Sequence, residues 1–226
     1  MKKELLKKIV RKKINKYEFA LITNIYNGEN CVYEKNRSLA KSFKKYEKKI
    51  NSYFNSNKTG IIENTNIFIE TYKSPIKVII IGAVHISQYL INFIKYLNFD
   101  IFLIDPRKHF ASKERFPEID IINEWPDKAL TKIDAGINTA LITLSHDPKI
   151  DDPALKQAIR RKFFYIGALG SKNTHLKRCS RLKKSGFSNK EISKIFGPIG
   201  IKLGGKSSAE IALSITAQLI SEINKK

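Results

Sequence analysis

The stretch Lys77-Val-Ile-Ile-Ile-Gly-Ala-Val-His-Ile-Ser87 decides the fold. Its first five residues are rich in β-branched side chains and predict a buried strand. Gly82 predicts a tight turn, and the apolar spacing that follows predicts a helix over 86–97. A strand that passes through a glycine turn into a helix is the opening unit of a doubly wound α/β domain.

The alternation of strand and helix continues to the C-terminus. We expect four further strands, over 101–105, 119–122, 139–144 and 163–166, and helices between them over 126–132 and 152–161. Asp151-Asp152-Pro153 is expected to cap the second of these helices, and Ser188 and Ser207 each open a helix with a capping box. Such alternation predicts right-handed βαβ units. The fold class is therefore α/β, with a doubly wound, Rossmann-like parallel sheet over 75–226.

Residues 1–74 follow a different pattern and predict a small α+β domain. A basic helix over 3–16 has an apolar stripe that we expect to pack on its own domain. Strands over 19–25 and 31–33 form a hairpin, a helix starts at Ser38 and runs to about residue 54, and a second hairpin joins 61–62 to 67–72. Pro75 marks the boundary between the two domains.

The net charge of +21 comes from 42 Lys plus Arg against 21 Asp plus Glu in 226 residues. Most of the cations are lysines, and neither a zinc finger, a helix-turn-helix nor an RNA-binding signature is present, so no nucleic-acid partner is expected. No apolar run approaches the roughly 20 residues that span a bilayer. Two distant cysteines favour a reducing, cytoplasmic location.

The turn after the first strand of the α/β domain resembles a dinucleotide-binding turn in its position but not in its glycines. It contributes four candidate ligand-binding residues, Gly82, Ala83, His85 and Ser87. Asp105 follows 23 positions after Gly82, where an acidic residue can bind ribose hydroxyls. Only the first of three glycines is present, however, and Val84 obstructs the approach of a pyrophosphate. NAD(P) is therefore a weakly supported cofactor.

The ends of the other strands add more candidate residues to the same edge of the sheet. Arg107 and Arg115 supply planar guanidinium groups for a phosphate or carboxylate. Gly167, Gly170 and Ser171 form a turn that opens a helix, which is the better anion cradle of the two glycine turns. The remaining candidates follow the 139–144 strand: Ser145, His146 and Asp147. No catalytic residue and no metal-ligand set stands out.

Many separate motifs, taken in order, resemble the C-terminal domain of the XdhC/CoxI/CoxF family. They are Gly82-Ala-Val-His-Ile-Ser-Gln88, Asp105-Pro-Arg107, Arg115-Phe-Pro117, Glu124-Trp-Pro126, His146-Asp-Pro-Lys149, Phe164-Tyr-Ile-Gly-Ala-Leu-Gly-Ser171, Thr174-His175, Gly197-Pro-Ile-Gly200 and Ser208-Ala-Glu-Ile-Ala212. The resemblance covers about residues 76–222, while the first 70 residues resemble only the shorter, CoxF-like members.

The resemblance implies a Rossmann domain and a maturation factor for molybdenum hydroxylases, of the xanthine dehydrogenase or carbon monoxide dehydrogenase type. Such a factor binds molybdenum cofactor, holds it during sulfuration and inserts it into the apoenzyme, and so acts as a chaperone more than as an enzyme. Its implied partners are the apo hydroxylase and a sulfur donor, a cysteine desulfurase, and a homodimer is left open. Two alternatives remain: an NAD(P)-binding oxidoreductase-like protein, and a protein–protein adaptor with a vestigial nucleotide crevice.

Overall fold

The computed structural model describes residues 3–14, 17–35 and 37–225. The chain divides into two compact units, Met1–Pro75 and Ile76–Lys226. Each unit has buried apolar clusters of its own, so each is described by itself.

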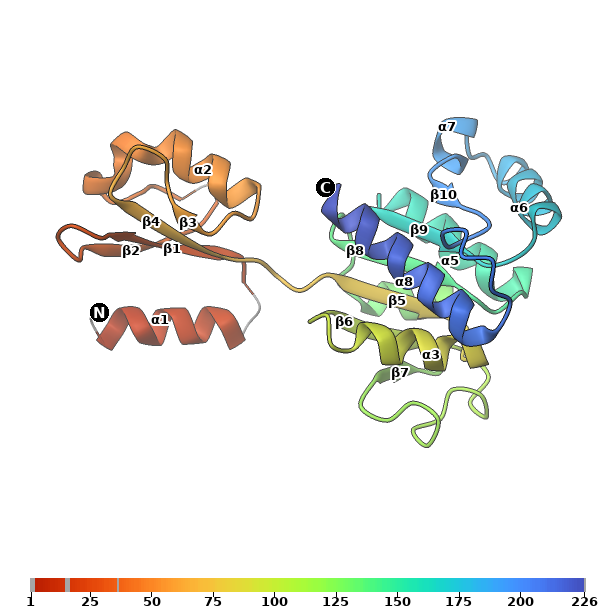
Figure 1. Ribbon diagram of the computed structural model, residues 1–226. Helices are drawn as coiled ribbons and strands as arrows, with labels where there is room; N and C mark the ends of the chain where they lie inside the picture. The colour runs from red at the N-terminus through yellow and green to blue at the C-terminus, as the bar shows by residue number, and fades with distance from the viewer. Residues whose placement is uncertain (1–2, 15–16, 36, 226) are drawn as a thin grey trace. The chain divides into compact units, whose positions relative to one another are not determined.

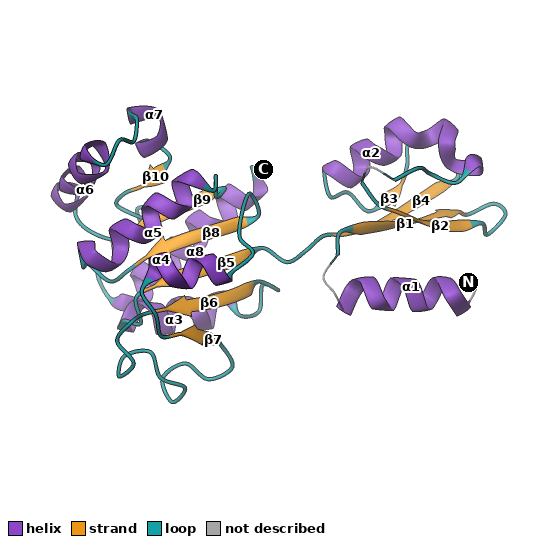
Figure 2. Cartoon of the chain, turned by 180° about the vertical axis from the view of Figure 1, so that it is seen from behind, coloured by secondary structure: helices purple, strands orange, loops and turns teal. Residues whose placement is uncertain are grey.

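The N-terminal unit is a four-stranded antiparallel sheet with the strand order β2-β1-β4-β3. Its strands are β1 (Phe19–Asn24), β2 (Asn30–Tyr33), β3 (Gly60–Ile61) and β4 (Ile67–Tyr72). Helix α2 (Glu47–Asn55), which follows the 3-10 helix η1 (Lys41–Tyr46), covers one face of the sheet, and α1 (Lys3–Ile14) lies along the other face (Figures 1 and 2). The sequence therefore predicted both hairpins and both helices of this unit.

Two expectations for the N-terminal unit are wrong in detail. The second helix begins at Lys41 as a 3-10 turn and not at Ser38, because Leu39 is buried in the core within an extended segment. Of the apolar stripe of α1, Ile9 is buried, but three aliphatic side chains face solvent: Leu6, Val10 and Ile14. The expected end of this helix at 15–16 lies outside the described residues.

The C-terminal unit is a six-stranded, fully parallel sheet with the order β10-β9-β8-β5-β6-β7. Numbered from the first strand of this unit, that is the Rossmann order 3-2-1-4-5-6. The strands are β5 (Lys77–Ile81), β6 (Asp100–Ile104), β7 (Asp120–Ile122), β8 (Thr139–Thr143), β9 (Tyr165–Ala168) and β10 (Ile195–Phe196). The predicted Rossmann-like sheet is confirmed; the two-residue β10 was not predicted.

Helices cover both faces of this sheet (Figures 1 and 2). They are α3 (His85–Ile94), α4 (Pro126–Ala129) with the 3-10 turn η2 (Leu130–Lys132), α5 (Pro148–Arg160), α6 (Lys172–Lys184), α7 (Asn189–Ile192) and α8 (Ser208–Asn224). Side chains alternate along β5, so Val78 and Ile80 pack with α3 and α8, whereas Ile79 and Ile81 pack with α4 and α5. The apolar run at the start of the α/β domain is thus buried on both faces.

Helix α5 begins four residues earlier than expected. Asp147 is its N-cap and accepts a hydrogen bond from the Lys149 N–H, and Pro148 takes the first helical position. Asp151, Asp152 and Pro153 are therefore inside the helix and do not cap it. Pro148 and Pro153 each follow an aspartate, so either Asp–Pro pair could start a helix. In the structure Asp147 is the residue that caps α5. The capping boxes at Ser188 and Ser207 are present as predicted.

Candidate ligand crevice

The strand order reverses between β5 and β8, and this is where ligands bind in open α/β sheets. Ile81 is paired with Ile104 and with Thr143, and Thr143 is paired with Ala168. The four strands therefore end at one level. The turns that follow them bring together most of the residues that the sequence singled out, at the carboxyl edge of the sheet.

The β5–α3 turn is closed by its own hydrogen bonds. Gly82 has φ +102°, and a Cβ there would lie 2.8 Å from the Ser145 backbone nitrogen, so only glycine fits. The Ala83 N–H donates to Asp105 at 2.8 Å, and the Val84 N–H donates to the Ser87 hydroxyl at 3.2 Å. These amides are not free to cradle a pyrophosphate, and His85 beyond them is exposed.

Asp105 directly follows β6 at the carboxyl edge of the sheet and is fully buried. Burial by itself would raise the pKa of its carboxyl, but hydrogen bonds from Arg107 and from the Ala83 N–H hold that pKa below its ordinary value. The Arg107 Nε and Nη2 lie 2.9 and 2.7 Å from the two carboxylate oxygens. A ribose could reach this carboxylate only by displacing the guanidinium group.

Arg107 is the exposed partner of this pair. Its guanidinium stacks over the Phe110 ring at 4.7 Å, and its Nη1 makes no hydrogen bond within the described part of the chain. Hydrogen bonding to Asp105, together with the charges of Asp147 and Asp151, raises its pKa, so the cation is permanent. Arg107 therefore keeps a donor available for an anion.

Ser145 connects the β8 end of the crevice to a buried acid. Its hydroxyl donates to Asp151 Oδ1 at 2.6 Å and accepts the Asp147 N–H at 3.1 Å. Burial raises the pKa of the Asp151 carboxyl to about 6. His146 has φ +62° and is exposed in this turn.

The β9–α6 turn differs from the β5–α3 turn because its amides are open. Ser171 caps α6 by accepting the Thr174 N–H at 3.1 Å. In the described part of the chain no hydrogen bond uses the N–H groups of residues 170–173. At Gly170 φ is +138°, and a Cβ would lie 2.8 Å from the Thr174 side chain. Gly167 was expected in this turn but lies inside β9, where a Cβ would clash with the Ile199 side chain.

Sequence reasoning missed Arg178, which is buried behind the β9–α6 turn. Its Nη2 donates to the Leu169 carbonyl at 2.7 Å, while its Nε and the Thr143 hydroxyl are buried with no hydrogen-bond partner in the described structure. Burial lowers the pKa of this guanidinium, which the nearby Asp151 and Asp152 partly offset. Arg178 lies within a lysine-rich helix, so its residue type gave no sign of burial. Its spacing of three from His175, whose Nδ1 it approaches at 3.5 Å, was the one available signal.

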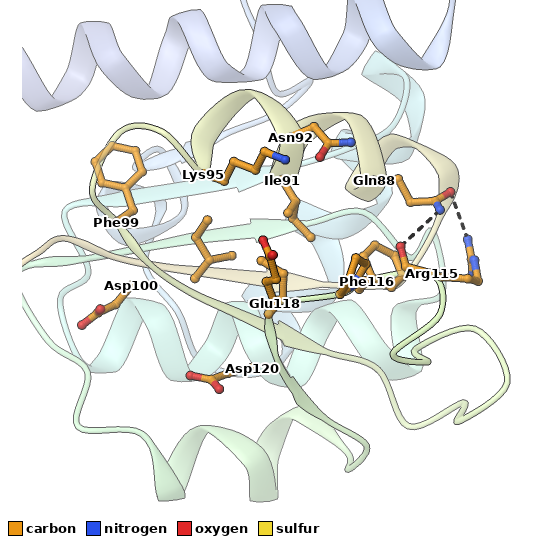
Figure 3. A pocket seen from close by; sticks show the side chains of 13 residues that line it. Gln88, Ile91, Asn92, Lys95, Phe99, Asp100, Arg115, Phe116, Glu118 and Asp120 are labelled. Carbon is orange, nitrogen blue, oxygen red and sulfur yellow. Dashed lines mark hydrogen bonds between the residues drawn. The ribbon is translucent and has the colours of Figure 1, made fainter.

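Arg115 is hydrogen-bonded within the protein and is therefore less available to an anion than Arg107. Its Nη1 donates to the carbonyls of Ala83 at 3.0 Å and Phe110 at 2.6 Å. Figure 3 shows its further contacts with Gln88, beside a separate cavity of about 460 Å³ between α3 and residues 115–120. That cavity is lined by polar side chains such as Asn92, Lys95, Glu118 and Asp120, and lies beside the starts of β6 and β7.

The described residues hold no group of three or more His, Cys, Asp or Glu side chains that could bind a metal ion. Burial raises the pKa of Cys31 to about 11, so this thiol is protonated at neutral pH. Within the described ranges, no helix is long and apolar enough to cross a bilayer.

Comparisons with known proteins place this geometry in a family. Residues 78–219 match the family model described as the XdhC Rossmann domain. Over 101 residues the chain is 38% identical to the molybdenum cofactor insertion chaperone PaoD of Escherichia coli, and the match covers 45% of this chain and 31% of that protein. Over 159 residues it is 26% identical to a probable xanthine dehydrogenase subunit of Bacillus subtilis, covering 70% of this chain and 46% of that protein.

The fold also matches a solved structure. A crystal structure described as a xanthine dehydrogenase from Bacillus halodurans superposes with a TM-score of 0.74 at 21% identity, covering 99% of this chain and 65% of that one. The alignments span less than half of the two curated relatives. Because the family model matches well over half of the chain, this protein belongs to the XdhC Rossmann domain family.

Proposed function

We propose that this protein binds molybdenum cofactor in the crevice at the carboxyl edge of its parallel sheet and inserts it into a molybdenum hydroxylase of the xanthine dehydrogenase type. Family membership and the similarity to a molybdenum cofactor insertion chaperone support this function. The cofactor is cargo here, so moderate affinity and release are expected, and catalytic turnover is not part of the proposal.

One contrast within the crevice carries the proposal. In the β5–α3 turn, the N–H groups of Ala83 and Val84 donate to side chains of the protein itself. Among the described residues, the N–H groups of residues 170–173 at the start of α6 and the Arg107 Nη1 make no hydrogen bond. Open amides at the N-terminus of a helix favour a phosphate group, and a guanidinium adds a planar donor pair. The crevice therefore suits a phosphorylated, polar ring such as molybdopterin better than a dinucleotide.

Different residues would bind different parts of the cofactor. Gly170 and Ser171 would hold the phosphate through their backbone amides, and Arg107 would bind a second anionic or carbonyl oxygen. Ser145, His146 and Asp147 would contact the polar ring from the β8 side. Gly82 and Gly167 allow the close approach of Ser145 and Ile199, and Asp105 fixes the orientation of Arg107.

The finer points of the proposal rest on the family resemblance and on the sequence. We propose that sulfuration takes place while the cofactor is held, with a cysteine desulfurase as sulfur donor. A carbon monoxide dehydrogenase is a second candidate client, a homodimer is the candidate assembly, and the cytoplasm is the proposed location. Residues 1–74 would form a domain separate from the cofactor-binding one.

Co-purification tests the proposal. The protein made in a host that synthesises molybdenum cofactor should carry pterin, measured by its fluorescence after oxidation, and molybdenum. Arg107→Ala should carry several-fold less of both, and Arg160→Ala, an exposed arginine at the end of α5, should carry as much as the parent. Equal loading of both variants would contradict the site. Tight binding of NADH with no bound pterin would favour the dinucleotide alternative instead.

A further inference from the structure

Helix α1 is fixed on its sheet in one orientation. Ile9 is buried, the Lys12 ammonium forms an ion pair with Glu34 at 2.7 Å, and the Lys13 ammonium lies 4.1 Å from the centre of the Tyr72 ring. These contacts, with the half-buried Leu5 one turn before Ile9, occupy the sheet-facing side of the helix. The face that points away from the sheet is therefore a fixed surface.

That outward face carries a row of large aliphatic side chains. Leu6, Val10 and Ile14 are 48, 46 and 73% exposed and follow one another at four-residue spacing. Such a row is the ridge that one helix inserts into the groove of another. Lys7 and Arg11 lie beside this ridge on the same open face of the helix. Large aliphatic side chains gathered on one exposed face mark an interaction site.

The positive charge of α1 favours an acidic partner surface. Helix α1 carries six Lys or Arg residues and one Glu, and two of the cations lie within 4 Å of the Glu34 carboxylate. The outward cations Lys7 and Arg11 have no acidic partner among the described residues. A second α1 docked on this face would bring its own excess of cations against Lys7 and Arg11 and would be repelled there. The occupant must combine an aliphatic groove with a carboxylate rim.

We propose that the outward face of α1 docks on an acid-rimmed apolar groove of the client hydroxylase, with Leu6, Val10 and Ile14 as the buried ridge and Lys7 and Arg11 as the flanking charges. This inference rests on the proposed function for the identity of the client. A bilayer surface is less favoured because the exposed stripe contains no Trp or Phe, the residues that anchor basic helices at an interface.

The test compares binding with cofactor loading. Cofactor-loaded full-length protein would be titrated against a purified, cofactor-free hydroxylase of the xanthine dehydrogenase type from the same source, by biolayer interferometry. Leu6→Ser with Val10→Ser, and separately Lys7→Glu with Arg11→Glu, should each weaken binding at least tenfold. Because these side chains are exposed, far-UV circular dichroism and the bound pterin should stay unchanged.

The control variants have matched exposure elsewhere. Leu213 is also 48% exposed, on α8, and Lys183 and Lys184 are exposed at the end of α6. Leu213→Ser and Lys183→Glu with Lys184→Glu should bind the hydroxylase as tightly as the parent.

Parent-like affinity of both α1 variants would overturn the docking proposal while leaving cofactor binding intact. Recruitment of the parent, but not of the α1 variants, to vesicles of phosphatidylglycerol and phosphatidylcholine, with hydroxylase binding unaffected, would overturn it in favour of a membrane. Loss of pterin from the parent would instead count against the proposed function.

Discussion

At the scale of single residues, the crevice is shaped by close contacts that few side chains allow. Gly82 lies against the Ser145 backbone, Asp105 is buried beneath Arg107, and Asp151 is buried beneath Ser145. Each of these contacts fixes the position of a group at the carboxyl edge of the sheet. Two of them lead to predictions about stability.

Replacing Gly82 by Ala should destabilise the C-terminal unit. The new Cβ would lie 2.8 Å from the Ser145 nitrogen in a backbone with φ +102°, which costs about 2 kcal/mol in unfolding free energy. Urea unfolding measures this difference. Gly136→Ala is the matched control, because a Cβ there meets nothing within 4 Å. Equal stability of Gly82→Ala and the parent would show that the turn is not held as described.

The pKa of Asp151 predicts a pH-dependent stability. Its folded-state pKa, about 6, is above the ordinary value of 3.8, so its stabilising contribution is complete below pH 4 and is lost as the pH rises through 6. The loss amounts to roughly 3 kcal/mol, at 1.36 kcal/mol for each unit of pKa.

In Asp151→Asn the amide oxygen can still accept the hydrogen bond of Ser145, but the group no longer titrates. Unfolding free energies from pH 4.5 to 7.5 should therefore fall less steeply in this variant than in the parent. Parallel curves would mean that the carboxyl titrates near its ordinary pKa.

Residue type and position predicted most of the side chains that lie at this edge of the sheet, because most of them follow the ends of parallel strands. Burial could not be predicted in the same way. Asp105 has the position of an open ribose ligand, yet Arg107 covers it, and Arg178 has the setting of a surface cation in a lysine-rich helix, yet it is buried. Both outcomes depend on three-dimensional contacts that no local pattern records.

At the scale of elements, the two glycine turns lead into helices of different chemical character. Helix α3 begins with its turn amides already bonded, while α6 begins with the amides of 170–173 open beside a Ser171 cap. The positive end of the α6 dipole therefore remains available to an anion. The motif that most resembles a nucleotide site is thus the closed one.

Removing the cap of α6 should affect both stability and cargo. Ser171→Ala loses the bond to the Thr174 N–H and should cost about 1 kcal/mol in unfolding free energy. Ser207→Ala removes the corresponding bond to the Glu210 N–H of α8 and should cost a similar amount. Pterin retention should fall only in Ser171→Ala. A similar loss of pterin in both variants would point to general destabilisation and away from a binding role for α6.

Hydrophobic periodicity and turn or capping residues predicted most helices and strands, because each of these signals is local in sequence. The β-branched run over 77–81 predicted β5. A serine with a glutamate three residues later predicted the starts of α7 and α8. The start of α5 was misplaced since two Asp–Pro pairs compete for it, and the helix at 38 was misplaced because Leu39 enters the core. The two-residue β10 depends on pairing with β9 and has no periodic pattern of its own.

At the scale of the whole molecule, the chain consists of two compact units, each with its own apolar clusters. The crevice residues all belong to 76–226. The net charge is +11 over residues 1–60, −1 over 61–150 and +11 over 151–226. A background composition rich in lysine explains much of this charge, and the outward face of α1 is where a use for it is best supported.

The C-terminal unit should therefore fold and bind cargo without the N-terminal one. Residues 76–226, expressed alone in a cofactor-producing host, should unfold cooperatively and retain as much pterin as the full chain, but should no longer bind the hydroxylase tightly. Circular dichroism melting and pterin fluorescence measure the first two properties. A folded fragment without pterin would show that the crevice is incomplete without residues 1–75.

Mass spectrometry of the small molecules released from gently purified full-length protein tests the central claim most directly. We expect a molybdopterin species, with molybdenum, in the parent protein and several-fold less of it in Arg107→Ala. A dinucleotide in its place, or a parent protein that carries no pterin from a host that makes the cofactor, would contradict the proposed function.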